Sequence, residues 1–213
     1  MTTRRPFRLG VTGGIASGKS TVMRRLAELG AETVDSDVTY HGLIQPGAPL
    51  FQAVVGRWGD RVVAPDGTLD RKALGAIVFA NPDELAALDA LTHPTIRRAT
   101  DAMYEVSTAE VFAVDAVKLI ESGHADACDA VWLVVADPET QIRRLVDRRR
   151  IAPDDAARRV AAQPPVEEKI DRADTVLRND GTVRELMAAV DSAWAALPLD
   201  GPRKAEMVAA APV

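Results

Sequence analysis

The stretch Gly13-Gly14-Ile15-Ala16-Ser17-Gly18-Lys19-Ser20 decides the fold, because it satisfies the pattern G-x-x-x-x-G-K-[ST] in full. The apolar run Phe7 to Thr12 precedes it and predicts a strand, while Ser17 to Leu29 carries apolar residues at helical spacing. Between a strand and a helix, the glycines let backbone N–H groups turn inward around phosphate oxygens, and the helix N-terminus adds positive charge. The stretch therefore predicts a site for a nucleoside triphosphate with Mg²⁺.

The side chains of this loop suggest separate roles. Lys19 is expected to reach the terminal phosphates, and the Ser20 hydroxyl is expected to bind Mg²⁺. The alternative is a glycine-rich turn with an incidental lysine, which the flanking strand and helix disfavour. The predicted nucleotide-binding residues of the loop are Gly14, Ile15, Ala16, Ser17, Gly18, Lys19, Ser20 and Thr21.

Short apolar segments along the chain predict a parallel sheet. Glu32 to Val34 forms a second strand, so strand, helix and strand make a βαβ unit. Val111 to Val117 and Ala130 to Val135 suit buried parallel strands, and Thr175 to Leu177 suits a last short strand. The fold class is α/β: a P-loop nucleoside triphosphate hydrolase-like parallel sheet core flanked by helices.

Helical patterns fill the rest of the chain. They cover 38–60 with a break at Gln45-Pro46-Gly47, 71–78, 81 to about 91, 93 to about 107, 138–149, 154–163 and 183 to about 197. We expect a single P-loop kinase domain with a core at about 7–37, 109–143 and 170–197. A helical acceptor-binding insertion at about 38–108, a lid at about 144–165 and a frayed tail at 198–213 complete it.

Composition and charge exclude several classes of protein. The 213 residues are 47% hydrophobic and 27% charged, which is enough apolar content for a core and excludes a wholly disordered chain. With 26 Lys plus Arg against 31 Asp plus Glu, the net charge of -5 disfavours nucleic acid and membrane surfaces as partners. A lone cysteine, Cys128, and the lack of a signal peptide or an apolar span predict a cytoplasmic protein.

An arginine-rich segment points to a small-molecule kinase. The guanine-reading Asn-Lys-x-Asp motif and the Leu-Ser-Gly-Gly transporter signature are both absent from the sequence. Arg144 and Arg148 share a helix face at i, i+4, and a mobile lid that closes over ATP phosphates needs such cations. The alternative is a solvated helix face paired with acidic neighbours.

Two carboxylates follow the second strand, where ligands bind in open α/β sheets. Asp35 or Asp37 is placed to accept the proton of a substrate hydroxyl or to orient Mg²⁺ water. The alternative is an N-cap for the next helix, provided by Ser36 or Asp37. Spacing alone leaves both interpretations open.

With these features in place, the chain resembles the dephospho-coenzyme A (dephospho-CoA) kinase family from Leu9 to about Leu197. The resemblance covers the phosphate loop and Val34-Asp35-Ser36-Asp37, which looks like the family's Asp-Ala-Asp segment. Further matching stretches, in the family's order, are Gln45-Pro46-Gly47, Asp66-Gly67-Thr68-Leu69-Asp70-Arg71, Val78-Phe79, His93-Pro94, Arg159-Val160-Ala161-Ala162-Gln163, Ala173-Asp174 and Asn179-Asp180-Gly181.

The resemblance implies ATP-dependent phosphorylation of the ribose 3′-hydroxyl of dephospho-CoA, giving CoA and ADP. It implies that Asp37 is the catalytic base and that Arg148, with Arg144 behind it, covers the developing charge. It places Asn179 and Gly181 near the adenine end of ATP. His93 fits a substrate-side segment, with a helix-capping or core histidine as the alternative.

The sequence departs from the family pattern at two places. Val117-Lys118-Leu119-Ile120-Glu121 stands where the family usually has Pro-Leu-Leu-Phe-Glu, so Lys118 either contacts a phosphate of the acceptor or pairs with Glu121 or Asp115. Asp115 is also a candidate to bind Mg²⁺ indirectly, through a water of the ion. His41 stands where the family usually has Arg, and a neutral imidazole is a weaker anion partner.

Two other hypotheses keep the ATP site. One is a kinase for another small acceptor such as a nucleotide, suggested by Lys118 and His41. The other is a non-catalytic ATP-binding regulatory module, which would bind nucleotide without acceptor-stimulated ADP release. The presence of Lys19, Ser20 and Asp37 together favours an enzyme.

Overall fold

The computed structural model describes residues 5–201 of the chain. These residues form two compact units. The first unit comprises residues 5–34 and 107–201, and the second comprises residues 35–106. Each unit has a hydrophobic core of its own.

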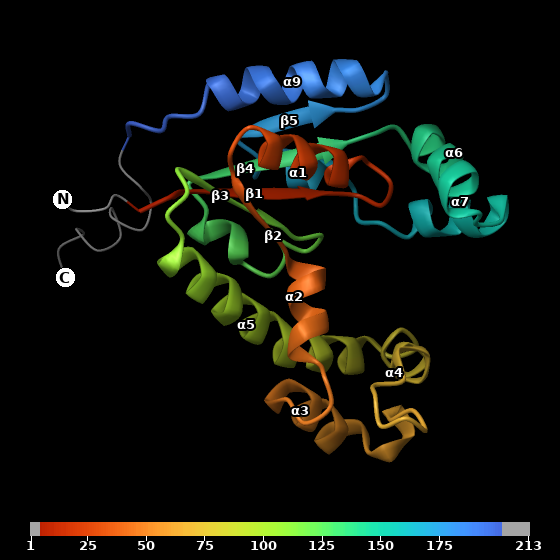
Figure 1. Cartoon of the computed structure of the whole chain (residues 1–213). Helices are drawn as coiled ribbons and strands as arrows, with labels where there is room; N and C mark the ends of the chain where they lie inside the picture. The colour runs from red at the N-terminus through yellow and green to blue at the C-terminus, as the bar shows by residue number, and fades with distance from the viewer. Residues whose placement is uncertain (1–4, 202–213) are drawn as a thin grey trace. The chain divides into compact units, whose positions relative to one another are not determined.

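A parallel sheet forms the centre of the first unit (Figure 1). Its five strands have the order β2-β3-β1-β4-β5. The strands are β1 (Phe7–Gly13), β2 (Glu32–Asp35), β3 (Val111–Asp115), β4 (Ala130–Val135) and β5 (Thr175–Arg178). Every residue of β1, β3 and β4 is buried, as expected for parallel strands covered on both faces. The α/β prediction is confirmed.

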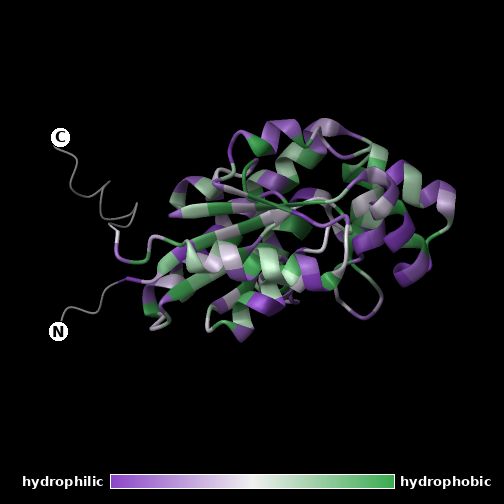
Figure 2. Ribbon diagram, turned by 90° about the horizontal axis from the view of Figure 1, so that it is seen from above, coloured by the Kyte–Doolittle hydropathy of each residue, from purple (hydrophilic) through white to green (hydrophobic). Residues whose placement is uncertain are grey.

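Helices α1 (Lys19–Glu28) and α9 (Val183–Ala195) lie side by side against this sheet (Figure 1). Val22 and Leu26 of α1 and Leu186 of α9 share one core with the strand residues Leu9 and Trp132. Helices α6 (Pro138–Arg149) and α7 (Pro153–Ala161) pack on each other, and two short helices, η2 (His124–Ala127) and α8 (Glu167–Ile170), complete the unit. In Figure 2 the central strands are mainly hydrophobic, while the helices alternate in hydropathy as amphipathic helices do.

The second unit is helical. It contains α2 (Ser36–Leu43), α3 (Pro49–Trp58), η1 (Asp60–Val62), α4 (Arg71–Val78) and α5 (Pro82–Val106). Its core includes Leu50, Val54, Trp58 and Leu74, all at most 4% exposed. The helix predicted over 71–78 and the break at Gln45-Pro46-Gly47 are confirmed.

Two predictions of secondary structure are wrong. The helices expected on either side of His93-Pro94 form one helix, α5, with Pro94 inside it. Pro94 has no N–H to donate, but apolar side chains of α5 such as Leu88 and Leu91 pack on the core of the second unit and hold the helix together. The strand expected over 111–117 ends at Asp115, because the chain turns there and Val117 is exposed.

Other segments were not anticipated. No sequence pattern predicted η1, η2 or α8, which are each four residues or shorter. Of the predicted frayed tail over 198–213, residues 202–213 lie outside the described residues. Among the helices of residues 5–201, none has the length and apolar character needed to cross a membrane.

Candidate active site

The phosphate loop connects β1 to α1 at the carboxyl end of a central strand. Ala16 and Gly18 have positive φ angles of 53° and 108°, which fold the loop back toward the helix. Among the residues that the structure describes, no group accepts from the backbone N–H of Gly18, Lys19 or Ser20. These donors and the positive end of α1 make the loop a site for anions.

Lys19, the first residue of α1, directs its ammonium group to Asp115 at the end of β3. The Nζ to Oδ1 distance is 2.8 Å, and the two side chains are 14% and 10% exposed. Asp115 therefore lies beside the lysine predicted to bind phosphate. Ser20 is exposed at the same end of α1, and Thr21 is half-buried behind it.

Asn179 holds the phosphate loop by a hydrogen bond to its backbone. Its side-chain N–H donates to the carbonyl of Ser17 at 2.7 Å, and the residue is 5% exposed. A Cβ on Gly18 would lie 2.1 Å from Asn179 Nδ2, so only glycine leaves room for this contact. Gly181 follows nearby in sequence and precedes the Thr182–Glu185 capping box of α9. Asn179 and Gly181 were predicted to lie near the adenine of ATP. In the structure the side chain of Asn179 contacts the phosphate loop.

Arg144 of α6 bonds to the same backbone. Its guanidinium donates to the carbonyl of Ala16 at 3.2 Å and to the carbonyl of Asn179 at 2.7 Å. Burial, with the nearby guanidinium groups of Arg148 and Arg143, lowers the pKa of Arg144. Arg148 is exposed, and within the described part of the chain its guanidinium makes no hydrogen bond or ion pair. The two arginines thus differ. Arg144 bonds to the backbone of the loop, whereas the guanidinium of Arg148 is exposed to solvent.

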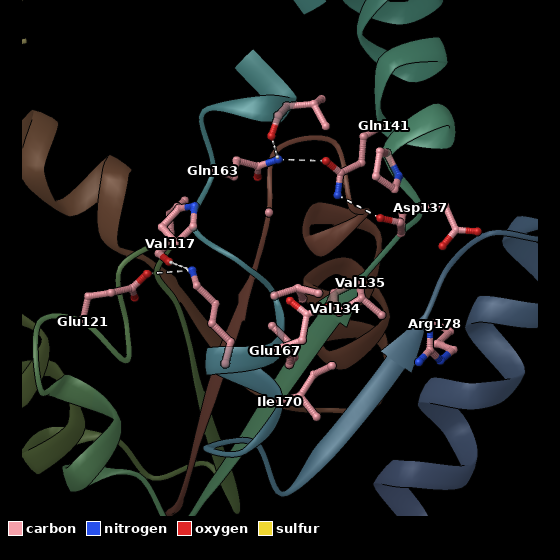
Figure 3. Close-up of a pocket in the computed structure, with 18 of the residues that line it drawn as sticks. Val117, Glu121, Val134, Val135, Asp137, Gln141, Gln163, Glu167, Ile170 and Arg178 are labelled. Carbon is pink, nitrogen blue, oxygen red and sulfur yellow. Dashed lines mark hydrogen bonds and ion pairs between the residues drawn. The ribbon is translucent and has the colours of Figure 1, made fainter. Parts of the chain in front are cut away.

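A cavity of about 580 Å³ opens beside the loop within the first unit (Figure 3). Polar residues on its wall include Lys118, Gln141, Gln163, Lys169 and Arg178. Lys169 Nζ pairs with Glu121 Oε1 at 2.8 Å across one side of this cavity. The sequence suggested Asp115 and Glu121 as partners for Lys118. In the structure Asp115 pairs with Lys19, and Glu121 pairs with Lys169.

Asp35 and Asp37 have different roles at the start of α2. Asp35 is the N-cap, and its carboxylate accepts from the N–H of Asp37 at 2.8 Å and of Val38 at 3.2 Å. Of the two interpretations left open for this pair, capping therefore applies to Asp35, and neither Ser36 nor Asp37 is the capping residue. Asp37 is exposed, and among residues 5–201 its carboxylate has no hydrogen bond or ion pair.

In the second unit His41 lies against Arg71, which belongs to one of the stretches that resemble the family but was not among the predicted site residues. Arg71, the first residue of α4, places its guanidinium against both ring nitrogens of His41, with Nη1 to Nε2 at 3.0 Å. The same guanidinium lies 5.8 Å from the ring centre of Tyr40. Burial raises the pKa of Tyr40, and Arg71 acts in the opposite direction. The guanidinium of Arg71 thus lies beside His41, a contact between residues 30 positions apart that only the folded chain reveals.

His93 lies on α5 beside a carboxylate of the same helix. Its Nε2 is 3.3 Å from Asp89 Oδ1, an i, i+4 pair, and the two side chains are 27% and 31% exposed. His93 therefore lies inside α5 and is partly exposed, so it neither caps a helix nor belongs to the core.

A phosphate loop with a lysine at the first residue of the following helix, on a five-stranded parallel sheet, defines the class of P-loop nucleotide-binding proteins. The sequence model of the dephospho-CoA kinase family matches residues 7–185. The chain belongs to the dephospho-CoA kinase family, as the resemblance predicted. The family uses ATP as its phosphate donor.

Individual relatives agree with this assignment. The dephospho-CoA kinase of Geobacter metallireducens is 46% identical over 87% of this chain and 94% of its own length. That of Symbiobacterium thermophilum is 44% identical over 88% of this chain and 80% of its own length. A Thermus thermophilus protein of known crystal structure superimposes with a TM-score of 0.75 at 31% identity, covering 91% of this chain and 99% of its own.

Proposed function

We propose that the chain transfers the γ-phosphoryl group of ATP to the ribose 3′-hydroxyl of dephospho-CoA, giving CoA and ADP in the last step of CoA biosynthesis. The observation that carries the proposal is the family match over residues 7–185, which includes a phosphate loop with uncommitted N–H groups. In the reaction, the 3′-oxygen forms a bond to phosphorus while the bond between phosphorus and the leaving ADP oxygen breaks.

In this proposal, the loop and Lys19 hold the β- and γ-phosphates. The N–H groups of Gly18, Lys19 and Ser20 have no acceptor among the described residues, so phosphate oxygens meet donors without breaking protein hydrogen bonds. Asp115 keeps the Lys19 ammonium at the end of the sheet through its 2.8 Å contact. Asn179 and Arg144 keep the loop in shape by bonding to its carbonyls.

The Mg²⁺ ion that accompanies ATP fits the residues at the start of α1. Mg²⁺ keeps several waters and is held by few protein oxygens together with the phosphates. The exposed hydroxyl of Ser20, next to Lys19, suits that role, while no group of three His, Cys, Asp or Glu in residues 5–201 would hold a metal by itself. When bound, the ion neutralises phosphate charge.

Asp37 is the proposed base, because its carboxylate is exposed and not used for capping. It takes the 3′-hydroxyl proton as the oxygen attacks phosphorus. Arg148 covers the charge that develops on the transferring group, since its guanidinium is uncommitted within the described chain. We assign Arg144 to holding the loop.

Acceptor-binding residues are proposed in each unit, taken by itself. Arg71 and His41 present cationic and imidazole groups on one surface of residues 35–106, suited to an anionic acceptor. Lys118 adds positive charge at the wall of the cavity in the first unit. We further propose a cytoplasmic location, where the buried Cys128 stays reduced.

A coupled assay of ADP release tests the proposal. We expect ADP release to depend on added dephospho-CoA, and the product to carry the new phosphate at the ribose 3′-position by ³¹P NMR. Nucleoside monophosphates are the comparison acceptors. Preference for one of them would show a different acceptor, and ATP binding without acceptor-stimulated ADP release would show a regulatory module.

A further inference from the structure

A chain of amide hydrogen bonds links the phosphate loop to the segment after α7. The backbone N–H of Ile15 donates to Gln163 Oε1 at 2.7 Å. Gln163 Nε2 donates to Gln141 Oε1 at 2.9 Å, and Gln141 Nε2 donates to the carbonyl of Ala136 at 2.9 Å. Figure 3 shows both glutamine side chains above the cavity, joined by a dashed line. These hydrogen bonds thus connect the end of β4 to α6, α6 to the segment after α7, and that segment to the phosphate loop.

The backbone determines the direction of every bond in this chain. The carbonyl of Ala136 only accepts, so the amide nitrogen of Gln141 faces it and the amide oxygen faces Gln163. Gln163 must then turn its nitrogen to Gln141, where the carbonyl of Val160 also accepts from it at 3.2 Å. Its oxygen is left for Ile15. Because Gln141 is only 8% exposed, water does not readily replace these partners.

Gly14 provides the space for this contact. A Cβ on Gly14 would lie 2.5 Å from Gln163 Oε1, well inside contact distance. Gly14 is not among the residues with positive φ, so its backbone conformation does not itself require glycine. Gly14 thus leaves room for the Gln163 side chain in its observed position, and a larger residue would displace it.

We propose that Gln163 is a positioning residue for ATP binding, acting through the N–H of Ile15. It holds the peptide between Gly14 and Ile15, so that the N–H groups at the start of α1 keep their direction toward phosphate. The inference rests on the proposed function only in that the loop binds ATP. It assigns a task to Gln163 and Gln141, neither of which touches the reacting atoms.

Replacing the glutamine tests the proposal. We expect Q163A to raise the Kd for ATP, measured by titration calorimetry, about three- to tenfold, as for one lost hydrogen bond. The KM for ATP should rise equally and kcat at saturating ATP should change less than twofold. Q163M, which keeps the length without the amide, should behave like Q163A. The matched control is Q52A: Gln52 is exposed, donates to the carbonyl of Gly47 at 3.2 Å, and should leave both constants unchanged.

A double-mutant cycle with Gly14 sharpens the test. In G14A the added methyl displaces the Gln163 oxygen, so G14A should weaken ATP binding about as much as Q163A. The G14A/Q163A double variant should then be no weaker than either single variant. The inference would be overturned if the fold-changes in Kd of the two single variants multiplied in the double variant. It would also be overturned if the Kd of Q163A for ATP were unchanged or lower. Wild-type protein that binds ATP through Gln163 but releases no ADP with dephospho-CoA would overturn only the proposed function.

Discussion

Lys19 and Asp115 are coupled, so removing the lysine affects both catalysis and stability. K19A should lower kcat/KM about 100-fold or more, because a cation at the phosphates is lost. It should also lower the free energy of unfolding by about 1–3 kcal/mol, since the Asp115 side chain, 10% exposed, loses its lysine partner. In K19A/D115N, urea denaturation should show part of that stability restored while turnover stays low. Full activity in K19A would contradict the assignment.

Substitutions at Asp37 and Asp35 distinguish the role of catalytic base from the role of helix cap. D37N should lower kcat about 100- to 10 000-fold with little change in stability, because the exposed Asp37 carboxylate makes no internal contact in the described chain. D35A removes the acceptor for two N–H groups of α2 and should instead cost about 0.5–2 kcal/mol. Steady-state kinetics and thermal denaturation of both variants check this. Near-normal turnover of D37N would mean that another group takes the proton.

At the scale of elements, two of the four arginines of α6, Arg144 and Arg148, have different environments. R148A should lower kcat roughly 100- to 1000-fold and leave the melting temperature unchanged, since Arg148 is exposed. R144A leaves carbonyls of the loop and of Asn179 without a donor, so it should lower the melting temperature and weaken ATP binding as well. Differential scanning fluorimetry with and without ATP distinguishes them; identical effects of the two substitutions would refute the division of roles.

The ion pair between Arg25 of α1 and Asp191 of α9 is expected to make stability depend on pH. Asp191 accepts from Arg25 at 2.7 and 2.9 Å, and this contact lowers the pKa of Asp191 below its ordinary value. A lowered pKa in the folded state stabilises the protein above the unfolded pKa of about 3.9, and the contribution is lost as pH falls through the folded pKa. Urea denaturation from pH 7 to pH 3 should therefore show a smaller acid-induced loss in D191N than in wild type. Equal losses would show that this pair contributes nothing.

Elements defined by neighbouring residues were predictable, and those defined by distant ones were not. The phosphate loop and α1 follow from consecutive residues, so sequence patterns sufficed. The bond from Arg144 to Ala16 joins residues 128 positions apart, and Gln163 bonds to Ile15 across 148 positions, so no local pattern reveals them. For α5, the local rule that proline ends a helix was outweighed by tertiary packing of its apolar face.

At the scale of the whole molecule, the two units have separate cores, which predicts separate responses to core substitutions. Leu74 lies in the core of residues 35–106 and Leu186 in that of the sheet, 4% and 2% exposed respectively. Either change to alanine should cost its own unit about 2–5 kcal/mol. In L74A, hydrogen exchange measured by mass spectrometry should accelerate in peptides from 35–106 and stay slow in β1 and β4.

The substitution in the other core provides the matched control for this prediction. L186A should accelerate exchange in the strands, and because ATP is proposed to bind the first unit, added ATP should slow exchange in the L186A strands. ATP should have no such effect on the peptides that L74A loosens, since binding stabilises only the unit whose native state holds the ligand. Uniformly faster hydrogen exchange across residues 5–201 in both variants would instead mean that the chain unfolds as one cooperative body. Residues 35–106 could then not unfold while the phosphate loop stays formed.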